Sequence, residues 1–108
     1  MTYSIDINEM IKLLASNNAP ILLDVRRKVD YESTPQKIVG ATWRDPEKID
    51  TWVRDLPPSS SIVVYCVKGG TVSQSVVDRI RKEDLDAGFL EGGFKAWAQS
   101  GQPVEAVC

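Results

Sequence analysis

Apolar residues along this chain form two kinds of pattern, short continuous runs and stripes repeated every three or four residues. Continuous runs are typical of strands that are covered on both faces of a sheet. A stripe with a spacing of three or four residues marks the buried face of a helix. The alternation of the two patterns predicts an α/β domain with a largely parallel sheet. The runs cover 21–25, 62–65 and 86–90, and the stripes cover 7–15, 72–80 and 94–98.

Capping and breaking residues set the expected ends of several elements. Asp6 and Glu9 have the spacing of a helix N-cap and its reciprocal partner, so a first helix should start there and end near Asn17. Pro46 suits the first turn of another helix, which Pro57 should end. The remaining expectations are a helical turn and a loop over 29–37, a short strand over 38–43 and a linker over 59–61.

A cysteine lies where the central strand is expected to end and a helix to begin. Cys66 follows the run 62–65, and Gly69 and Gly70 then turn the chain into the helical stripe that starts at Val72. Backbone N–H groups in a glycine-rich turn and in the first turn of a helix have no partner of their own and favour negative charge. A helix N-terminus or a nearby cation also lowers the pKa of a thiol and makes the nucleophilic thiolate abundant. The loop is therefore predicted to hold an anion, with Cys66 as the nucleophile.

The alternative for Cys66 is a structural role, because a lone cysteine is most often a small buried hydrophobe. The loop argues against this alternative. Lys68 adds a positive charge, and Thr71 and Ser73 add hydroxyl groups, none of which a core cysteine needs. We therefore favour the functional interpretation.

Basic residues follow the first predicted strand. In a parallel sheet ligands bind beyond the carboxyl ends of the strands, so Arg26 could meet Cys66 there if the two strands are neighbours. Arg27 and Lys28 are interpreted as part of a solvated turn. Arg44 also follows a strand end and is a further candidate for the same crevice.

Composition and charge exclude several classes of function. The chain of 108 residues is 43% hydrophobic and 26% charged, as expected for one domain over 1–108. A net charge of −2 gives no electrostatic basis for binding nucleic acid or an anionic membrane. The first residues contain no stretch suited to a signal peptide, and no run approaches the roughly 20 apolar residues of a membrane span. A cytoplasmic location is therefore expected.

The histidine and cysteine content limits the available chemistry. The absence of histidine excludes a Cys–His pair, a Ser–His–acid triad and any metal site that contains histidine. Cys66 and Cys108 are too far apart in the sequence to build a thiolate zinc site, so neither a metal nor a cofactor is expected. Cys108 could be a resolving thiol, but a last residue is usually mobile and exposed. Cys66 must therefore act with backbone dipoles and cations.

Four motifs, in this order and at consistent separations, resemble those of single-domain rhodaneses. The resemblance covers nearly the entire chain. It implies the rhodanese fold, a small, largely parallel central sheet flanked by helices on both faces, with a six-residue active loop from Cys66 to Thr71. The motifs are Leu22 to Arg26, Val39 to Ala41, the strand–Cys66–helix unit, and Leu90 to Trp97 continued by Gly101 to Val104.

The activity of this family is sulfur transfer through a cysteine persulfide. The resemblance implies that the Cys66 thiolate attacks the outer sulfur of thiosulfate, or of a similar small anionic donor, and that sulfite leaves. The persulfide would then pass its sulfur to cyanide, to a thiol or to a thioredoxin-like acceptor. The N–H groups of Val67, Gly69, Gly70 and Thr71 would hold the negative charge of the persulfide.

Individual positions match or depart from the family pattern. Lys68 matches the cationic loop position of the thiosulfate-using members, and Gly69 and Thr71 also match their loop. Arg26 matches the arginine of the family's Asp-x-Arg step, which assists substrate in some members. Val67 departs from the arginine that often follows the cysteine, and this departure weakens the thiosulfate assignment.

Three other functions remain open. Phosphatases and arsenate reductases of the Cdc25 type share a related architecture, but they need an arginine at the position of Val72. Without that guanidinium there is little to hold a tetrahedral dianion. Many rhodanese-like domains are non-catalytic binding modules, although these often lack the cysteine. A persulfide carrier that passes sulfur to a protein partner lies between an enzyme and a binding module.

Overall fold

Short strands and helices alternate along residues 3–107, the part of the chain that this computed structural model describes. The strands are β1 (Ser4–Ile5), β2 (Ile21–Asp24), β3 (Gln36–Ile38), β4 (Thr42–Trp43), β5 (Ser61–Tyr65), β6 (Asp86–Leu90) and β7 (Val104–Ala106). The helices are α1 (Ile7–Ala15), α2 (Lys28–Ser33), α3 (Ile49–Trp52), α4 (Thr71–Arg81) and α5 (Gly93–Gln99). Two 3-10 turns, η1 (Pro46–Lys48) and η2 (Val53–Asp55), flank α3.

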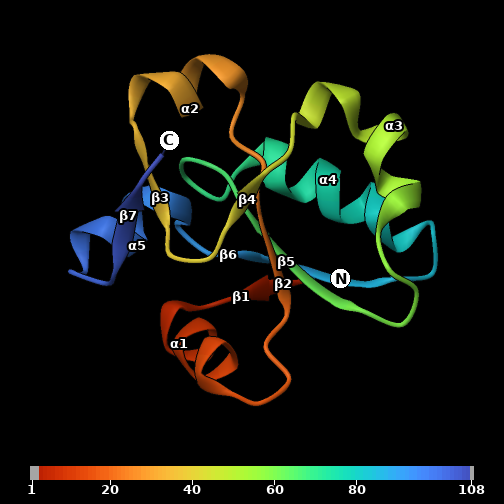
Figure 1. Cartoon of the computed structure of the whole chain (residues 1–108), viewed down its shortest axis with the longest axis horizontal. Coiled ribbons are helices and arrows are strands. Elements are labelled where there is room, and N and C mark those ends of the chain that lie inside the picture. The colour runs from red at the N-terminus through yellow and green to blue at the C-terminus, as the bar shows by residue number, and fades with distance from the viewer. Residues whose placement is uncertain (1–2, 108) are drawn as a thin grey trace.

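The central sheet has five parallel strands in the order β1-β6-β5-β2-β4. Figure 1 shows α3 and α4 on one side of these strands and α1 on the other. Strand β5 explains this division, because successive side chains of a strand point to opposite faces. Ile62 and Val64 pack with α3 and α4, whereas Val63 and Tyr65 pack with α1 and α5. The predicted fold class, a largely parallel sheet with helices on both faces, is therefore confirmed.

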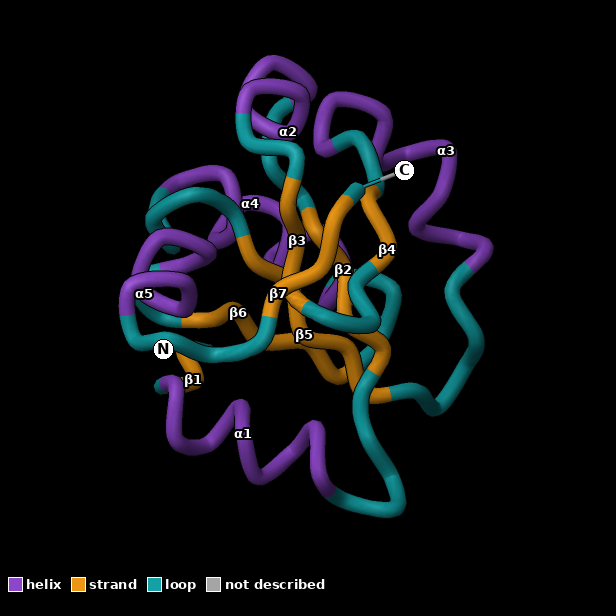
Figure 2. Tube along the Cα trace, turned by 60° about the vertical axis from the view of Figure 1, so that its left-hand side comes forward, coloured by secondary structure: helices purple, strands orange, loops and turns teal. Residues whose placement is uncertain are grey.

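Strands β3 and β7 lie outside the central sheet, where Figure 2 shows them side by side as an antiparallel pair. The single strand expected over 38–43 is wrong. Its first residue, Ile38, belongs to β3, while Thr42 and Trp43 form β4 in the central sheet. Gly40 turns the chain between them with φ +85°, a backbone conformation that glycine adopts without steric cost.

The helices begin largely where the sequence predicts them. The carboxylate of Asp6 accepts a hydrogen bond from the N–H of Glu9 at 2.8 Å, so the predicted cap of α1 is present. Helix α1 ends at Ala15, slightly before the expected Asn17. The helix expected after Pro46 is only four residues long, α3, and it is extended at both ends by the 3-10 turns. No helix in residues 3–107 is long and apolar enough to cross a membrane.

Parallel pairing brings the loops that follow β2, β4, β5 and β6 to one edge of the sheet. The loop after β5 contains Cys66, and the loop after β6 contains Gly92, which leads into Gly93, the first residue of α5. Because β5 pairs with both β2 and β6, the Cys66 loop lies between the loop that follows β2 and the loop that follows β6. The fold therefore places the predicted nucleophile at the edge where ligands bind to open parallel sheets.

The start of α5 is bound directly to the Cys66 loop. The N–H of Phe94 donates to the carbonyl of Cys66 at 2.8 Å, and the N–H of Lys95 donates to the carbonyl of Val67 at 3.0 Å. Gly93 has φ +59°, and a Cβ atom built there would lie 2.4 Å from the Cys66 carbonyl oxygen and 2.7 Å from the N atom of Gly69. Only glycine allows the backbone of α5 to approach the loop this closely.

Replacing Gly93 with alanine should therefore destabilise the protein strongly. The left-handed conformation and the overlap with backbone atoms together should lower the free energy of unfolding by about 3 kcal/mol. Gly101→Ala is the matched control, because Gly101 has φ +79° but nothing lies within 4 Å of its Cβ position. That control should cost only about 1 kcal/mol in urea unfolding. Equal losses in the two variants would show that the close approach at Gly93 carries no cost.

Candidate active site

A hollow of about 340 Å³ opens at the carboxyl edge of the sheet, and Cys66 forms part of its wall. Val67, Lys68, Gly70 and Thr71 border the hollow on the side of the same loop. Cys66 is 6% exposed, and it forms no disulfide with any described residue. The thiol is therefore free, largely covered by protein and adjacent to a space that a small molecule can enter.

The loop offers a series of unpaired backbone donors. None of the N–H groups from Val67 to Ser73 donates a hydrogen bond to another group within residues 3–107. The carbonyls of Cys66 and Val67 accept from α5. In a trans peptide the N–H points opposite to the C=O, so the N–H groups of Val67 and Lys68 point away from α5. Together with the first turn of α4, this arrangement favours a negative charge in the loop.

Three exposed charged side chains border the hollow beside the backbone donors. Lys68 comes from the loop, while Arg27 and Asp30 come from the start of α2. All three are exposed, and none forms an ion pair with another residue in the described part of the chain. Two cations and one carboxylate leave the hollow with a net positive charge, which suits an anionic ligand.

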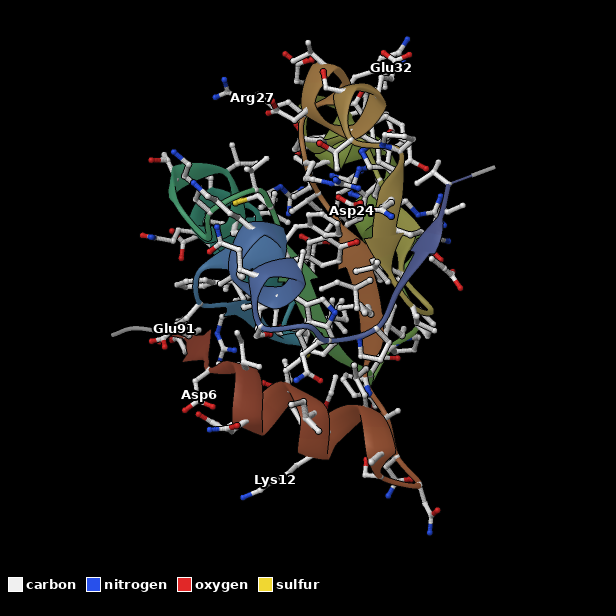
Figure 3. The ribbon with its side chains drawn as sticks, turned by 90° about the vertical axis from the view of Figure 1, so that its left-hand side faces the viewer. Asp6, Lys12, Asp24, Arg27, Glu32 and Glu91 are labelled. Carbon is white, nitrogen blue, oxygen red and sulfur yellow. The ribbon has the colours of Figure 1, made fainter. Side chains whose placement is uncertain are left out.

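Arg26 also borders the hollow, but its guanidinium is already engaged (Figure 3 labels its partner, Asp24, in the interior). Its Nε donates to the Asp24 carboxylate at 3.0 Å and its Nη2 at 2.6 Å, and both residues are at most 1% exposed. Nη2 also donates to the carbonyl of Gln36 at 2.7 Å. The guanidinium carbon lies 4.6 Å from the centre of the Phe94 ring. This arrangement favours a structural role for Arg26 over direct contact with substrate.

Tyr65 completes the buried group around Asp24. Its hydroxyl donates to the Asp24 carboxylate at 3.1 Å and accepts from the N–H of Ile38 at 3.1 Å. Burial, followed by the negative charge of Asp24, raises the pKa of Tyr65 well above its ordinary value. The phenol therefore stays neutral and serves as a fixed bridge between β2, β3 and β5.

The structure brings most of the predicted site residues together. Cys66, Lys68, Arg26, Val67, Gly70 and Thr71 all border the hollow. Gly69 does not, because it turns with φ +70° against the backbone of Leu90 and Gly92. Arg44 is not part of the wall. Ser73 is fully buried, and its hydroxyl has no hydrogen-bond partner among the described residues. Cys108 lies outside the described residues.

The sequence interpretation missed Arg27 and Asp30 as parts of the wall. The sequence analysis interprets Arg27 as part of a solvated turn, although the alternation of side chains along β2 indicates the face of the sheet on which Arg27 lies. Leu23 and Val25 face α3 and α4, and Arg27 continues that series by two residues, whereas Arg26 continues the series of Asp24. No comparable signal marks Asp30, because its position depends on the path of α2 after the strand.

Solved structures of similar fold include a rhodanese-related protein and a thiosulfate sulfurtransferase. A rhodanese-related protein from Thermoplasma volcanium is 22% identical, with a TM-score of 0.81 and coverage of 94% of this chain and 96% of that chain. A thiosulfate sulfurtransferase from Pseudomonas aeruginosa is 20% identical, with a TM-score of 0.80 and coverage of 99% of this chain and 20% of that chain. At this level of identity the likeness shows the fold.

Similar curated proteins include the tRNA 2-selenouridine synthase of Shewanella piezotolerans, which is 26% identical over 97 residues. The match covers 79% of this chain and 26% of that protein, so the chain spans only a minor part of its relative. The family model of the rhodanese-like domain matches residues 6–100. With its parallel sheet and its cysteine loop in place, this chain belongs to the rhodanese-like family.

Proposed function

We propose that this protein is a sulfurtransferase that carries a sulfane sulfur on Cys66 from thiosulfate, or a similar small anionic donor, to cyanide or a thiol. One observation carries the proposal. A free cysteine borders an accessible hollow and belongs to a loop whose N–H groups, from Val67 to Ser73, have no acceptor within residues 3–107. Family membership supports sulfur-transfer chemistry in general, and the Cys66 loop supports transfer through a persulfide on Cys66.

The reaction has two displacement steps at sulfur. The Cys66 thiolate attacks the outer sulfur of thiosulfate, a new S–S bond forms, and sulfite leaves with the electron pair of the bond that breaks. The product is a Cys66 persulfide anion. Cyanide or a thiolate then attacks the outer sulfur of the persulfide, and the Cys66 thiolate leaves. Neither displacement needs a proton donor when the reactants are anions, which fits a chain without histidine.

The residues that border the hollow have different roles in this reaction. Unpaired N–H groups of the loop stabilise the thiolate and the persulfide, since fixed dipoles need no reorganisation when the charge moves. Lys68 and Arg27 attract the anionic donor, and Asp30 opposes it. The expected cytoplasmic setting is part of the proposal, because a reducing compartment keeps Cys66 as a thiol.

A persulfide carrier for a protein partner would share the first step and differ only in the acceptor. A thioredoxin-like protein is one such acceptor, and sulfur appearing on it would support this variant. A binding module needs no thiol, so the free Cys66 beside the hollow favours the enzyme. A phosphatase of the Cdc25 type is not favoured, because Val72 borders the hollow at the position that would need an arginine.

A selenium-containing donor is a second candidate, favoured by the similarity to tRNA 2-selenouridine synthases. The loop chemistry is unchanged if the Cys66 thiolate attacks the selenium of selenosulfate and sulfite leaves. The candidate concerns the loading of Cys66 and not contact with RNA, since a net charge of −2 provides little attraction to phosphates. Intact mass after incubation with selenosulfate or thiosulfate distinguishes the two loaded forms.

Cys66→Ser should abolish sulfur transfer. The unmodified protein should gain the mass of one sulfur atom when mixed with thiosulfate and should form thiocyanate when cyanide is added. Cys66→Ser should do neither, because a hydroxyl cannot form the persulfide. Cys108→Ser is the matched control and should behave as the unmodified protein. An active Cys66→Ser variant would contradict the proposal, whereas an unmodified protein that neither gains sulfur nor forms thiocyanate would favour the binding-module alternative.

Lys68→Ala should weaken the use of thiosulfate. Loss of an exposed cation beside the hollow should raise the KM for thiosulfate about fivefold. Steady-state rates with cyanide as acceptor measure the change. Lys82→Ala, at the other end of α4, provides the control and should leave the KM unchanged. Identical KM values for the two variants would remove Lys68 from the donor site.

Asp30→Asn should have the opposite effect on the donor. Removal of the carboxylate from the wall should lower the KM for thiosulfate about threefold, because a repulsive charge is lost. The effect should shrink in high salt, which screens exposed charges. Asp55→Asn, in the exposed turn η2, is the control for a general change in net charge. A KM that stays constant or rises in Asp30→Asn would show that this carboxylate does not oppose the donor.

A further inference from the structure

The hydroxyl of Ser73 is the only buried side-chain nitrogen or oxygen in residues 3–107 without a hydrogen-bond partner. Ser73 is 0% exposed and is the third residue of α4. An unpaired buried hydroxyl costs free energy, and native structures contain few such groups. A serine within a helix often donates to the carbonyl four residues earlier, but for Ser73 that residue is Gly69, which precedes the helix. The hydroxyl is therefore available to an acceptor outside the helix.

Ser73 points towards the sheet and not towards solvent. Side chains four residues apart lie on the same face of a helix, and Ser73 precedes Val77 by four residues. Val77 is buried and belongs to the hydrophobic cluster that α4 forms with β5 and β6. Ser73 therefore continues that buried face by one turn, towards the Cys66 loop from which α4 begins.

Cys66 continues the same layer from the side of the sheet. Val64 belongs to the cluster of Val77, and alternate residues of a strand share a face, so Cys66 follows Val64 on the side of α4. Two strand residues advance about 6.6 Å and four helix residues advance about 6 Å. Because α4 starts at the loop that ends β5, both steps lead towards the carboxyl edge of the sheet. Cys66 and Ser73 therefore end this layer on its two sides.

Ser73 differs from the charged residues around Cys66. It is neutral, fully buried and absent from the wall of the hollow, so it lies on the protein side of the sulfur. The first turn of α4 contains no acidic residue. Apart from one buried ion pair, the charged residues of the surrounding elements are exposed and act from the solvent side. They are Lys68 of the loop, Arg27 and Asp30 of the α2 region, Glu91 after β6, Lys95 of α5 and the ion pair of Asp24 with Arg26.

We propose that the hydroxyl of Ser73 donates a hydrogen bond to the Cys66 thiolate and thereby increases the fraction of Cys66 that is ionised. A thiol is a weak acceptor and does not hold the hydroxyl, whereas a thiolate carries a full negative charge. The bond forms when Cys66 loses its proton to solvent and the hydroxyl turns towards the sulfur. This inference rests on the proposed function and assigns a further residue to the same site.

The ionised sulfur of Cys66 occurs twice in the proposed reaction. It attacks the donor in the first step, and it leaves the persulfide in the second. A donor on the buried side of the sulfur stabilises the thiolate in both steps and leaves the N–H groups of the loop to the anion in the hollow. Because Ser73 is inaccessible to solvent, its hydrogen bond is stronger than one in water and is little affected by salt.

The pH profile of Cys66 alkylation tests the role of Ser73. All proteins carry Cys108→Ser, so that iodoacetamide reacts only with Cys66. Below the midpoint of the profile, Ser73→Ala should react about tenfold more slowly, because a smaller fraction of Cys66 is ionised. Well above the midpoint, where Cys66 is ionised in both proteins, Ser73→Ala should react at least as fast. Ser75→Ala, at an exposed position of the same helix, is the matched control and should keep the original profile.

Urea unfolding and salt separate this role from two others. At a pH where Cys66 is protonated the hydroxyl makes no hydrogen bond, so Ser73→Ala should be at least as stable as the unmodified protein. The tenfold difference in alkylation should persist in about 1 M KCl, which screens exposed charges. A less stable Ser73→Ala variant, an unchanged alkylation profile or a difference that disappears in salt would each overturn the proposal.

The role of Ser73 and the proposed function fail separately. Alkylation reports the ionisation of Cys66 and needs no sulfur donor, whereas intact mass after incubation with thiosulfate reports the loading of Cys66. If Cys66 loads with sulfur but Ser73→Ala keeps the original profile, the role of Ser73 is wrong and the sulfurtransferase stands. If the profile depends on Ser73 as described but Cys66 does not load, the hydrogen bond to the thiolate stands and the sulfurtransferase is wrong.

Discussion

The direction of two peptide bonds determines the electrostatics of the Cys66 loop. Helix α5 contributes no side chain to the wall of the hollow, yet the N–H groups of Phe94 and Lys95 hold the carbonyls of Cys66 and Val67. These contacts also satisfy donors that the first turn of a helix would otherwise leave unpaired. Because each carbonyl is held by α5, the N–H group of the same peptide must face the other way. The absence of a side chain at Gly93 is what allows this contact, so a backbone requirement in one element sets the charge preference of another.

A buried ion pair fixes the surroundings of that loop. Asp24 and Arg26 are nearly inaccessible, and their contacts reach β3 through Gln36, β5 through Tyr65 and α5 through the ring of Phe94. Burying two charges is expensive, but removing only one partner would leave the other uncompensated, which typically costs about 3–5 kcal/mol. The pair therefore resists rearrangement of the elements that it joins. The same engagement makes Arg26 unsuited to bind an anion, and the charges available for ligands are those of Arg27, Asp30 and Lys68.

Local patterns predicted the centre of the structure well, and long-range contacts explain what they missed. The hydrophobic run and the glycines of the strand–Cys66–helix unit are local signals, and they are sufficient to predict where its strand, loop and helix lie. Strands β1 and β7 are too short for a recognisable pattern and exist because partners distant in the sequence pair with them. The pattern over 38–43 predicts a single strand, because periodicity does not reveal that the chain turns at Gly40 and that the residues on either side enter different sheets. The sequence correctly predicts that Arg26 lies at the carboxyl edge of the sheet. It does not predict the ion pair with Asp24, because a spacing of two residues is equally compatible with a paired and an unpaired arginine.

In the proposed reaction, the site must release sulfite as well as bind thiosulfate, and the mixed charges around Cys66 suit both requirements. A hollow lined only by cations would hold the donor tightly, and it would hold sulfite, the equally charged product, for the same reason. Asp30 reduces that attraction, while the neutral dipoles of the loop continue to favour the single negative charge on the persulfide. The proposed function therefore assigns the release of sulfite and the retention of the Cys66 persulfide to groups of different kinds. Side-chain charges act on the ligand in the open hollow, and backbone dipoles act on the sulfur that remains bound to the chain.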